Sequence, residues 1–76
     1  MNPKLPRITA AEFLRALLRD GWVRHRQVGS HVQLKHPSKP GRVTVPSHAG
    51  ITLKPKTLAR ALEQAELTVE ELTELL

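Results

Sequence analysis

The 76-residue sequence contains no cysteine. This absence excludes disulfide bonds, thiolate catalysis, zinc ribbons and iron–sulfur clusters, and it is typical of proteins of the reducing cytoplasm, where we expect this chain to act. Aromatic residues are also scarce, with one Phe, one Trp and no Tyr. The scarcity argues against a nucleic-acid-binding sheet that stacks bases on aromatic side chains.

Long apolar runs and mid-chain carboxylates are missing as well. No apolar run exceeds three residues, so the sequence predicts no membrane span, and the N-terminus does not resemble a signal peptide. No Asp or Glu lies between residues 21 and 62, the segment that holds all four histidines. No two of these histidines have the i, i+4 spacing of a helical metal site. We therefore predict no metal site and no cofactor.

Positive charge is what the sequence has in abundance. Residues 1–60 hold all 12 lysines and arginines and only two acids, a net charge of +10. Residues 61–76 hold five glutamates and no base, a net charge of −5. A basic body of this kind predicts a polyanionic partner, and a solvated basic surface without a partner is the alternative.

The length allows one small domain, residues 1–76, in which residues 1–7 form an extended lead-in. Capping boxes at Thr9–Glu12 and Thr68–Glu71 open a helix over about residues 10–20 and a short last helix within 67–76. Pro55 begins a helix over about residues 55–66.

Residues 22–28 are too short and too interrupted by charge for a helix, and residues 31–36 and 42–46 alternate in polarity. Together they predict a three-stranded antiparallel meander, which Gly29-Ser30 and a turn over residues 37–41 divide. Within it, His31 and Lys35 share one strand face, whereas Val32 and Leu34 share the other. The resulting order, α-β-β-β-α-α, is that of an α+β domain with helices on one face of the sheet. Trp22 is expected in the core, and Leu14 and Leu18 on the apolar face of the first helix.

A histidine among cations suits RNA cleavage without a metal. Its imidazole removes a proton from a ribose 2′-hydroxyl or protonates the leaving 5′-oxygen, while the cations stabilise the charge on phosphorus. His31 is the histidine in this position, although a surface or structural role is the more common one for a strand histidine. We expect His25 and His36 at the surface or on phosphates. The predicted RNA-binding residues are Arg24, Arg26, Lys35, Lys39, Arg42, Lys54 and Lys56.

An ordered set of motifs resembles the HicA family of bacterial toxins. The motifs are Gly21-Trp22, Arg26-Gln-Val-Gly-Ser-His31, Val43-Thr-Val-Pro-Ser-His48 and Leu53-Lys-Pro-Lys-Thr-Leu58. The resemblance implies a fold like the double-stranded-RNA-binding domain and a type II toxin that cleaves mRNA (an mRNA interferase). A HicB antitoxin would neutralise this toxin by covering its active surface. The family's catalytic histidine maps to His31, and its second histidine maps to His48.

Several roles stay open at this stage. Ser30 and His48 are candidates for catalysis or for positioning the substrate. Lys56 stands where the family usually has glycine, and it is either a substrate contact or a neutral replacement. The alternatives to a nuclease are an RNA-binding module without activity and a basic protein whose main role is to dock an acidic partner. We expect the toxin alone to be a monomer and to form a hetero-oligomer with its antitoxin.

Overall fold

The computed structural model describes residues 4–48 and 50–76. Its elements follow the predicted order, and the first two helices each end one residue earlier than predicted. The α+β fold resembling the double-stranded-RNA-binding domain is confirmed. Part of the predicted lead-in, residues 1–3, lies outside the described residues. The elements are α1 (Ala10–Arg19), β1 (Val23–Val28), β2 (His31–Lys35), β3 (Val43–Pro46), α2 (Pro55–Ala65) and α3 (Val69–Leu75).

Both predicted capping boxes are present, and they fix where α1 and α3 begin. At α1, the Glu12 backbone N–H donates to Thr9 Oγ1 over 3.2 Å, and the Thr9 N–H donates to the Glu12 carboxylate over 2.8 Å. Thr68 and Glu71 repeat the pattern at α3. The hydrogen bonds from Thr9, the backbone one first, hold the pKa of Glu12 below its ordinary value. At the other end of α1, Gly21 has a φ of 102°, which a residue with a side chain rarely adopts.

The sheet is antiparallel with the strand order β1-β2-β3, so β1 and β3 form its edges. Its inner face carries four buried residues, Val32, Leu34, Val43 and Val45. Alternation of side chains along each strand explains why these apolar residues share one face. The strand residues that alternate with these four lie on the opposite face, which points away from the helices and is called the outer face below.

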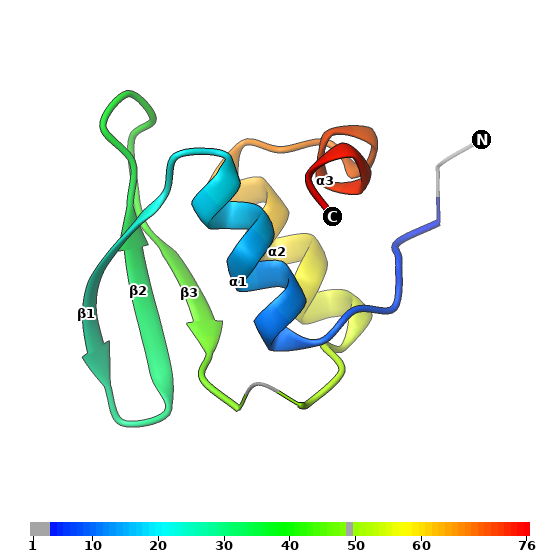
Figure 1. Cartoon of the computed structure of the whole chain (residues 1–76), viewed down its shortest axis with the longest axis horizontal. Coiled ribbons are helices and arrows are strands. Elements are labelled where there is room, and N and C mark those ends of the chain that lie inside the picture. The colour runs from blue at the N-terminus through cyan, green and yellow to red at the C-terminus, as the bar shows by residue number, and fades with distance from the viewer. Residues whose placement is uncertain (1–3, 49) are drawn as a thin grey trace.

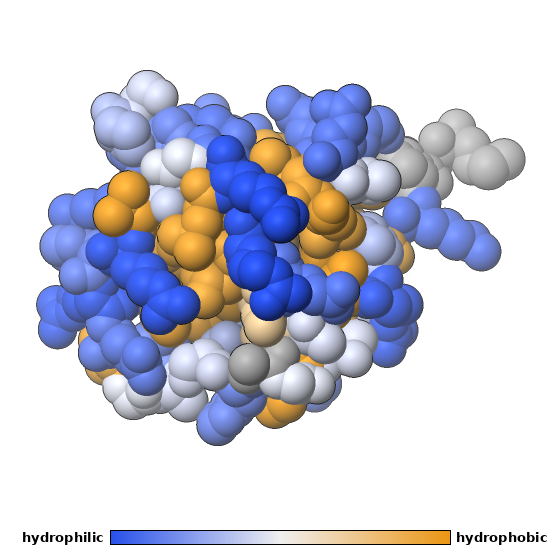
Figure 2. Space-filling view, viewed as in Figure 1, coloured by the Kyte–Doolittle hydropathy of each residue, from blue (hydrophilic) through white to orange (hydrophobic). Residues whose placement is uncertain are grey.

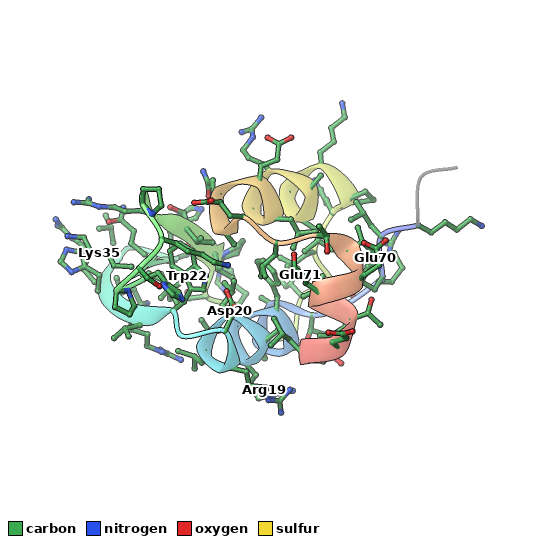
Figure 3. The ribbon with its side chains drawn as sticks, turned by 90° about the horizontal axis from the view of Figure 1, so that it is seen from above. Arg19, Asp20, Trp22, Lys35, Glu70 and Glu71 are labelled. Atoms are coloured by element: carbon green, nitrogen blue, oxygen red, sulfur yellow. The ribbon has the colours of Figure 1, made fainter. Side chains whose placement is uncertain are left out.

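The helices lie on one side of the sheet in two layers (Figure 1). Both α1 and α2 pack against β3, and α3 lies on the side of these helices that faces away from the sheet (Figure 3). Trp22 is only 1% exposed, so its prediction as a core residue is confirmed. Leu18 is 42% exposed although it lies on the apolar face of α1, whereas Phe13, Ala16 and Leu17 of the same helix are fully buried.

Candidate functional site

The pairing of β1 with β2, which a β-bulge interrupts, determines which β1 side chains share a face with His31. The pairing of β1 with β2 shifts by one residue between Arg24 and Arg26, and His25 is the extra residue. Paired residues on adjacent strands point to the same face. Val28 pairs with His31, which also pairs with Pro46, and Arg26 pairs with Gln33. Arg26 and Val28 therefore lie on the outer face with His31, whereas the bulge turns Arg24, which pairs with Leu34, to the inner face.

His31 begins β2 and is exposed on this outer face. Its ring makes no hydrogen bond to the residues that the structure describes. The Ser47 N–H donates to the Ser30 carbonyl oxygen over 2.7 Å and ties the segment after β3 to the β1–β2 turn. His48, which is also exposed, follows this tie directly. The fold thus gathers Ser30, His31 and His48 at one end of the sheet.

A cluster of positive groups lies at the other end of the outer face. Lys35 ends β2, and Arg42 precedes the residue of β3 that pairs with Leu34. The pKa of His25 is lowered, chiefly by the charge of Lys35, and further by partial desolvation and by the charges of Arg42 and Arg26. Figure 3 shows Lys35 on the side of the sheet that faces away from the helices.

Lys39, predicted to bind RNA, is engaged within the fold. Its ammonium donates to the Asp20 carboxylate over 2.8 Å and to the Ala65 carbonyl oxygen over 3.0 Å. These acceptors are the C-cap of α1 and the last residue of α2, where the helix dipoles favour a cation. Lys39 therefore joins the C-terminal ends of the two helices, and two of its three N–H donors are used within the fold.

His36 does not lie free at the surface, so the expectation for it is wrong. Its Nε2 lies 2.8 Å from the Asp20 carbonyl oxygen, and its Nδ1 accepts the backbone N–H groups of Ser38 and Lys39 over 3.0 and 3.2 Å. A nitrogen that accepts two N–H bonds carries no proton, so the proton is on Nε2. The half-buried ring also meets Trp22 edge-on, with 5.2 Å between the ring centroids.

The other predicted cations lie in two further places. Arg24 pairs with Leu34, which puts it on the inner face of the sheet, away from His31. Lys54 is the N-cap of α2, with no side-chain cap bond, and Lys56 is exposed in the first turn. The Leu53 N–H donates to the Ile8 carbonyl oxygen, and the Ala10 N–H donates to that of Ile51, so α1 and α2 begin near one another. Of the predicted RNA-binding residues, the outer face therefore holds Arg26 and Lys35, with Arg42 beside them.

Sequence reasoning missed the place of His25 in the cationic cluster and the outward turn of Val28. The outward turn of Val28 follows from its pairing with His31, and the place of His25 follows from the bulge, which no glycine marks in the sequence. Two arginines flanking a histidine at residues 24 to 26 on an edge strand were the available signal, since charges and bulges both protect sheet edges.

Neither a metal-binding cluster nor a membrane span occurs in residues 4–48 and 50–76. Among these residues, no three His, Asp or Glu side chains lie close enough together to hold a metal ion. Their helices are also too short and too polar to cross a bilayer.

Comparison with known protein families gives one match. The sequence model of a family described as HicA toxin of bacterial toxin-antitoxin matches residues 10–67. The matched segment runs from the start of α1 to just beyond α2, and it includes every residue predicted for the site. No curated protein matches the chain.

Proposed function

We propose, from the premise that the chain belongs to the HicA family of bacterial toxins, that it cleaves messenger RNA without a metal ion. Family membership makes it the toxin of a toxin–antitoxin system. The proposal adds that this system is of type II, that the toxin acts in the cytoplasm as an mRNA interferase, and that a HicB-type antitoxin neutralises it. The free toxin would be a monomer, and the neutralised form a hetero-oligomer.

The observation that carries the proposal is the exposed His31 ring on a cationic face of the sheet. A general base must reach its proton through solvent-accessible space, and the His31 ring is exposed. Arg26 shares this face, and Lys35 lies at the far end of the same strand. This arrangement holds a polyanion against the histidine and needs no metal ligand.

The reaction follows from the chemistry of RNA. His31 takes the proton of a ribose 2′-hydroxyl, the 2′-oxygen bonds to the adjacent phosphorus, and the bond from phosphorus to the 5′-oxygen breaks. The leaving 5′-oxygen takes up a proton, which leaves a 2′,3′-cyclic phosphate and a 5′-hydroxyl. Nearby cations stabilise the charge that develops on the phosphorane oxygens.

The neighbours of His31 have roles in this proposal. His48, which the tie between Ser47 and Ser30 holds at the same end of the sheet, is the candidate for protonating the leaving oxygen. Ser30 positions the turn that precedes His31. Lys54 and Lys56 add positive charge at the start of α2, where the helix dipole also favours a phosphate.

The test is cleavage of labelled RNA by the chain purified without its antitoxin. His31→Ala should lower the cleavage rate by about 100-fold or more, since general acid–base groups contribute that much. Its RNA affinity and melting temperature should stay close to the parental values. His25→Ala is the matched control, because it removes the same side chain from β1 and should leave cleavage intact.

Two further measurements sharpen the test. EDTA should leave the rate unchanged, and 2′-deoxy substitution at the cleaved position should stop the reaction. Parental cleavage by the His31→Ala variant would refute the role of this residue, and inhibition by EDTA would point to a metal.

An RNA-binding module without activity is the second candidate, and the cationic outer face favours it. Its signature would be RNA that stays intact and binds in a salt-dependent manner. Each phosphate contact would contribute about −0.7 to −0.9 to the slope of log K against log salt.

A further inference from the structure

A groove runs between the exposed side of α1 and the inner face of β1, on the side of the sheet opposite His31. It has a volume of about 330 Å³. Its helical wall spans Ala10 to Leu18, a length of about 12 Å at 1.5 Å per residue. The residues that line it are Ala10, Ala11, Leu14, Arg15, Leu18, Arg24, Gln27, Val32, Pro46 and Ser47.

The groove exists because the helices do not cover the whole sheet. Both α1 and α2 pack against β3, so β1 projects beyond them, and all six of its residues are exposed (Figure 1). Arg24 and Gln27 both face α1, because Arg24 pairs with Leu34 and Gln27 with Val32, and it is the bulge that brings Arg24 to this face. The part of β1 that the helices leave uncovered and the exposed side of α1 thus form the two walls of an open groove.

The groove has an apolar floor, and positively charged side chains lie at its rim. Leu14 is half-buried and Leu18, one turn further along α1, is 42% exposed, so the two leucines give this side of the helix a partly open apolar surface. Arg15 and Arg24 are exposed on opposite walls, and no acidic residue is among the described residues that line the groove. Figure 2 shows this face, where apolar surface lies between strongly hydrophilic side chains.

Such a surface suits a protein segment better than RNA. RNA bases bind proteins through stacking on aromatic rings, and the groove is lined by aliphatic side chains with no aromatic ring. Protein segments use aliphatic floors, and carboxylates pair with arginines at the rim. A helix of two turns or an extended stretch of about four residues would match the length of the wall.

We propose that this groove is the docking site of the antitoxin, which fills it with an acidic amphipathic segment. Apolar side chains of the segment contact Leu14 and Leu18, and its carboxylates pair with Arg15 and Arg24. The identity of the partner as an antitoxin rests on the proposed function, whereas the chemistry of the segment rests on the groove.

The groove adjoins the end of the sheet that carries His31. Pro46 and Ser47 close one end of it, Pro46 pairs with His31, and the Ser47 N–H binds the Ser30 carbonyl oxygen. A partner anchored in the groove therefore begins next to the catalytic end of the sheet but on its opposite face. Antitoxin binding and RNA cleavage should then be separable by mutation.

The experiment compares two exposed leucines. Leu18→Glu places a carboxylate between Arg15 and Arg24, and Leu76→Glu makes the same change at a residue of similar exposure, 44%, outside the groove. The probe is the purified antitoxin, taken as the protein that restores growth when it is produced together with this chain. Calorimetry gives its affinity, and RNA cleavage with and without it gives inhibition.

We expect Leu18→Glu to weaken antitoxin binding by about tenfold or more, since it removes an apolar contact at the centre of an interface. This variant should cleave RNA at the parental rate and resist inhibition, while Leu76→Glu should match the parental chain in both assays. Arg15→Glu, on the same wall, should weaken binding mainly through slower association. Circular dichroism of each variant shows whether it is folded, and Leu18→Ala replaces Leu18→Glu if the latter is not.

Three results would overturn the docking site. In the first, the Leu18 variant binds the antitoxin and is inhibited as the parental chain is. In the second, the folded variant loses RNA cleavage, which would make the groove part of the RNA surface. In the third, the variant alters only self-association in sedimentation, which would make a second copy of this chain the occupant. A parental chain that binds antitoxin through the groove but cleaves no RNA would refute the proposed nuclease alone.

Discussion

Two histidines bracket β2, and their surroundings differ in almost every respect. His31 begins the strand on the outer face of the sheet, where its ring is exposed and free of hydrogen bonds to the described residues. His36 follows the strand, where both ring nitrogens are bonded to backbone groups and the ring packs on Trp22. One residue type thus serves as a candidate catalyst and as a structural clamp within a span of six positions. The surroundings, and not the side chain, set the role.

Two lysines repeat this contrast around the β2–β3 turn. Lys35 extends from the sheet into solvent with Arg42 and His25 nearby, whereas Lys39 is held between the C-terminal ends of α1 and α2. Both were predicted to bind RNA from their charge alone. The comparison shows that not every cation is available to a partner, because part of the charge stabilises the fold.

The largest effects should come from replacing each of the two histidines by alanine, because one variant should lose stability and the other should lose cleavage. His36→Ala removes the acceptor of two N–H groups, the bond to Asp20 and the contact with Trp22, so it should lower the free energy of unfolding by roughly 2–3 kcal/mol. Cleavage by the molecules that remain folded should be unchanged. Urea denaturation and a cleavage assay at low temperature measure the two quantities. His31→Ala should instead keep the parental stability and lose cleavage. Equal stability of the two variants would mean that His36 does not stabilise the fold.

A smaller effect should separate the two lysines. Lys39→Met and Lys35→Met each remove one positive charge and keep most of the apolar side chain, so they are matched in net charge. Lys39→Met should cost about 1 kcal/mol of stability, because the ion pair with Asp20 is only partly shielded from solvent. Lys35→Met should leave the melting temperature unchanged and reduce the salt slope of RNA binding by about 0.7 to 0.9. If both variants weaken RNA binding equally and neither affects stability, the distinction between the two lysines is wrong.

The smallest effect concerns His25 and the pH. Positive neighbours, Lys35 first, lower its pKa below the ordinary value of 6.5, so the free protein disfavours the charged ring. RNA phosphates would offset that repulsion, and binding should therefore take up a proton. Affinity for an uncleavable 2′-deoxy RNA should rise a few-fold between pH 7.5 and 5.5. The same shift makes the free chain lose stability as the pH falls through 6.5.

His25→Gln is the control for this pH effect, because it keeps a polar side chain that does not titrate. Binding by this variant should depend less on pH than binding by the parental chain. An identical pH profile in the two proteins would mean that another group takes up the proton and that His25 does not lie at the proposed RNA-binding surface.

Local sequence signals predicted the elements well. Thr9 with Glu12, and Thr68 with Glu71, fixed two helix starts through hydrogen bonds within four residues, so no distant contact was needed. Alternating polarity in β2 and β3 assigned the faces of Val32, Val43 and Val45 correctly, because the period of a strand is two. The same alternation could not assign β1, where the bulge shifts the period at His25.

Roles that depend on distant partners could not be predicted. Lys39 meets Asp20 and Ala65 across 19 and 26 positions of the chain, and nothing near Lys39 in sequence indicates either contact. Leu18 follows the apolar spacing of its helix, and only the overhang of β1 leaves it exposed. For the catalytic assignment of His31, the structure supplies exposure and a cationic face, and the role itself stays a prediction.

The sequence by itself determined the element order, the helix starts and the strand faces of β2 and β3, because capping, turns and side-chain alternation act between near neighbours. Only the tertiary structure decided which cations are free and which histidine is a clamp. It also decided that a groove with an apolar floor lies opposite the His31 face. These outcomes depend on how far the helices cover the sheet and on where the C-terminal ends of α1 and α2 meet, and such long-range packing leaves no local trace in the chain.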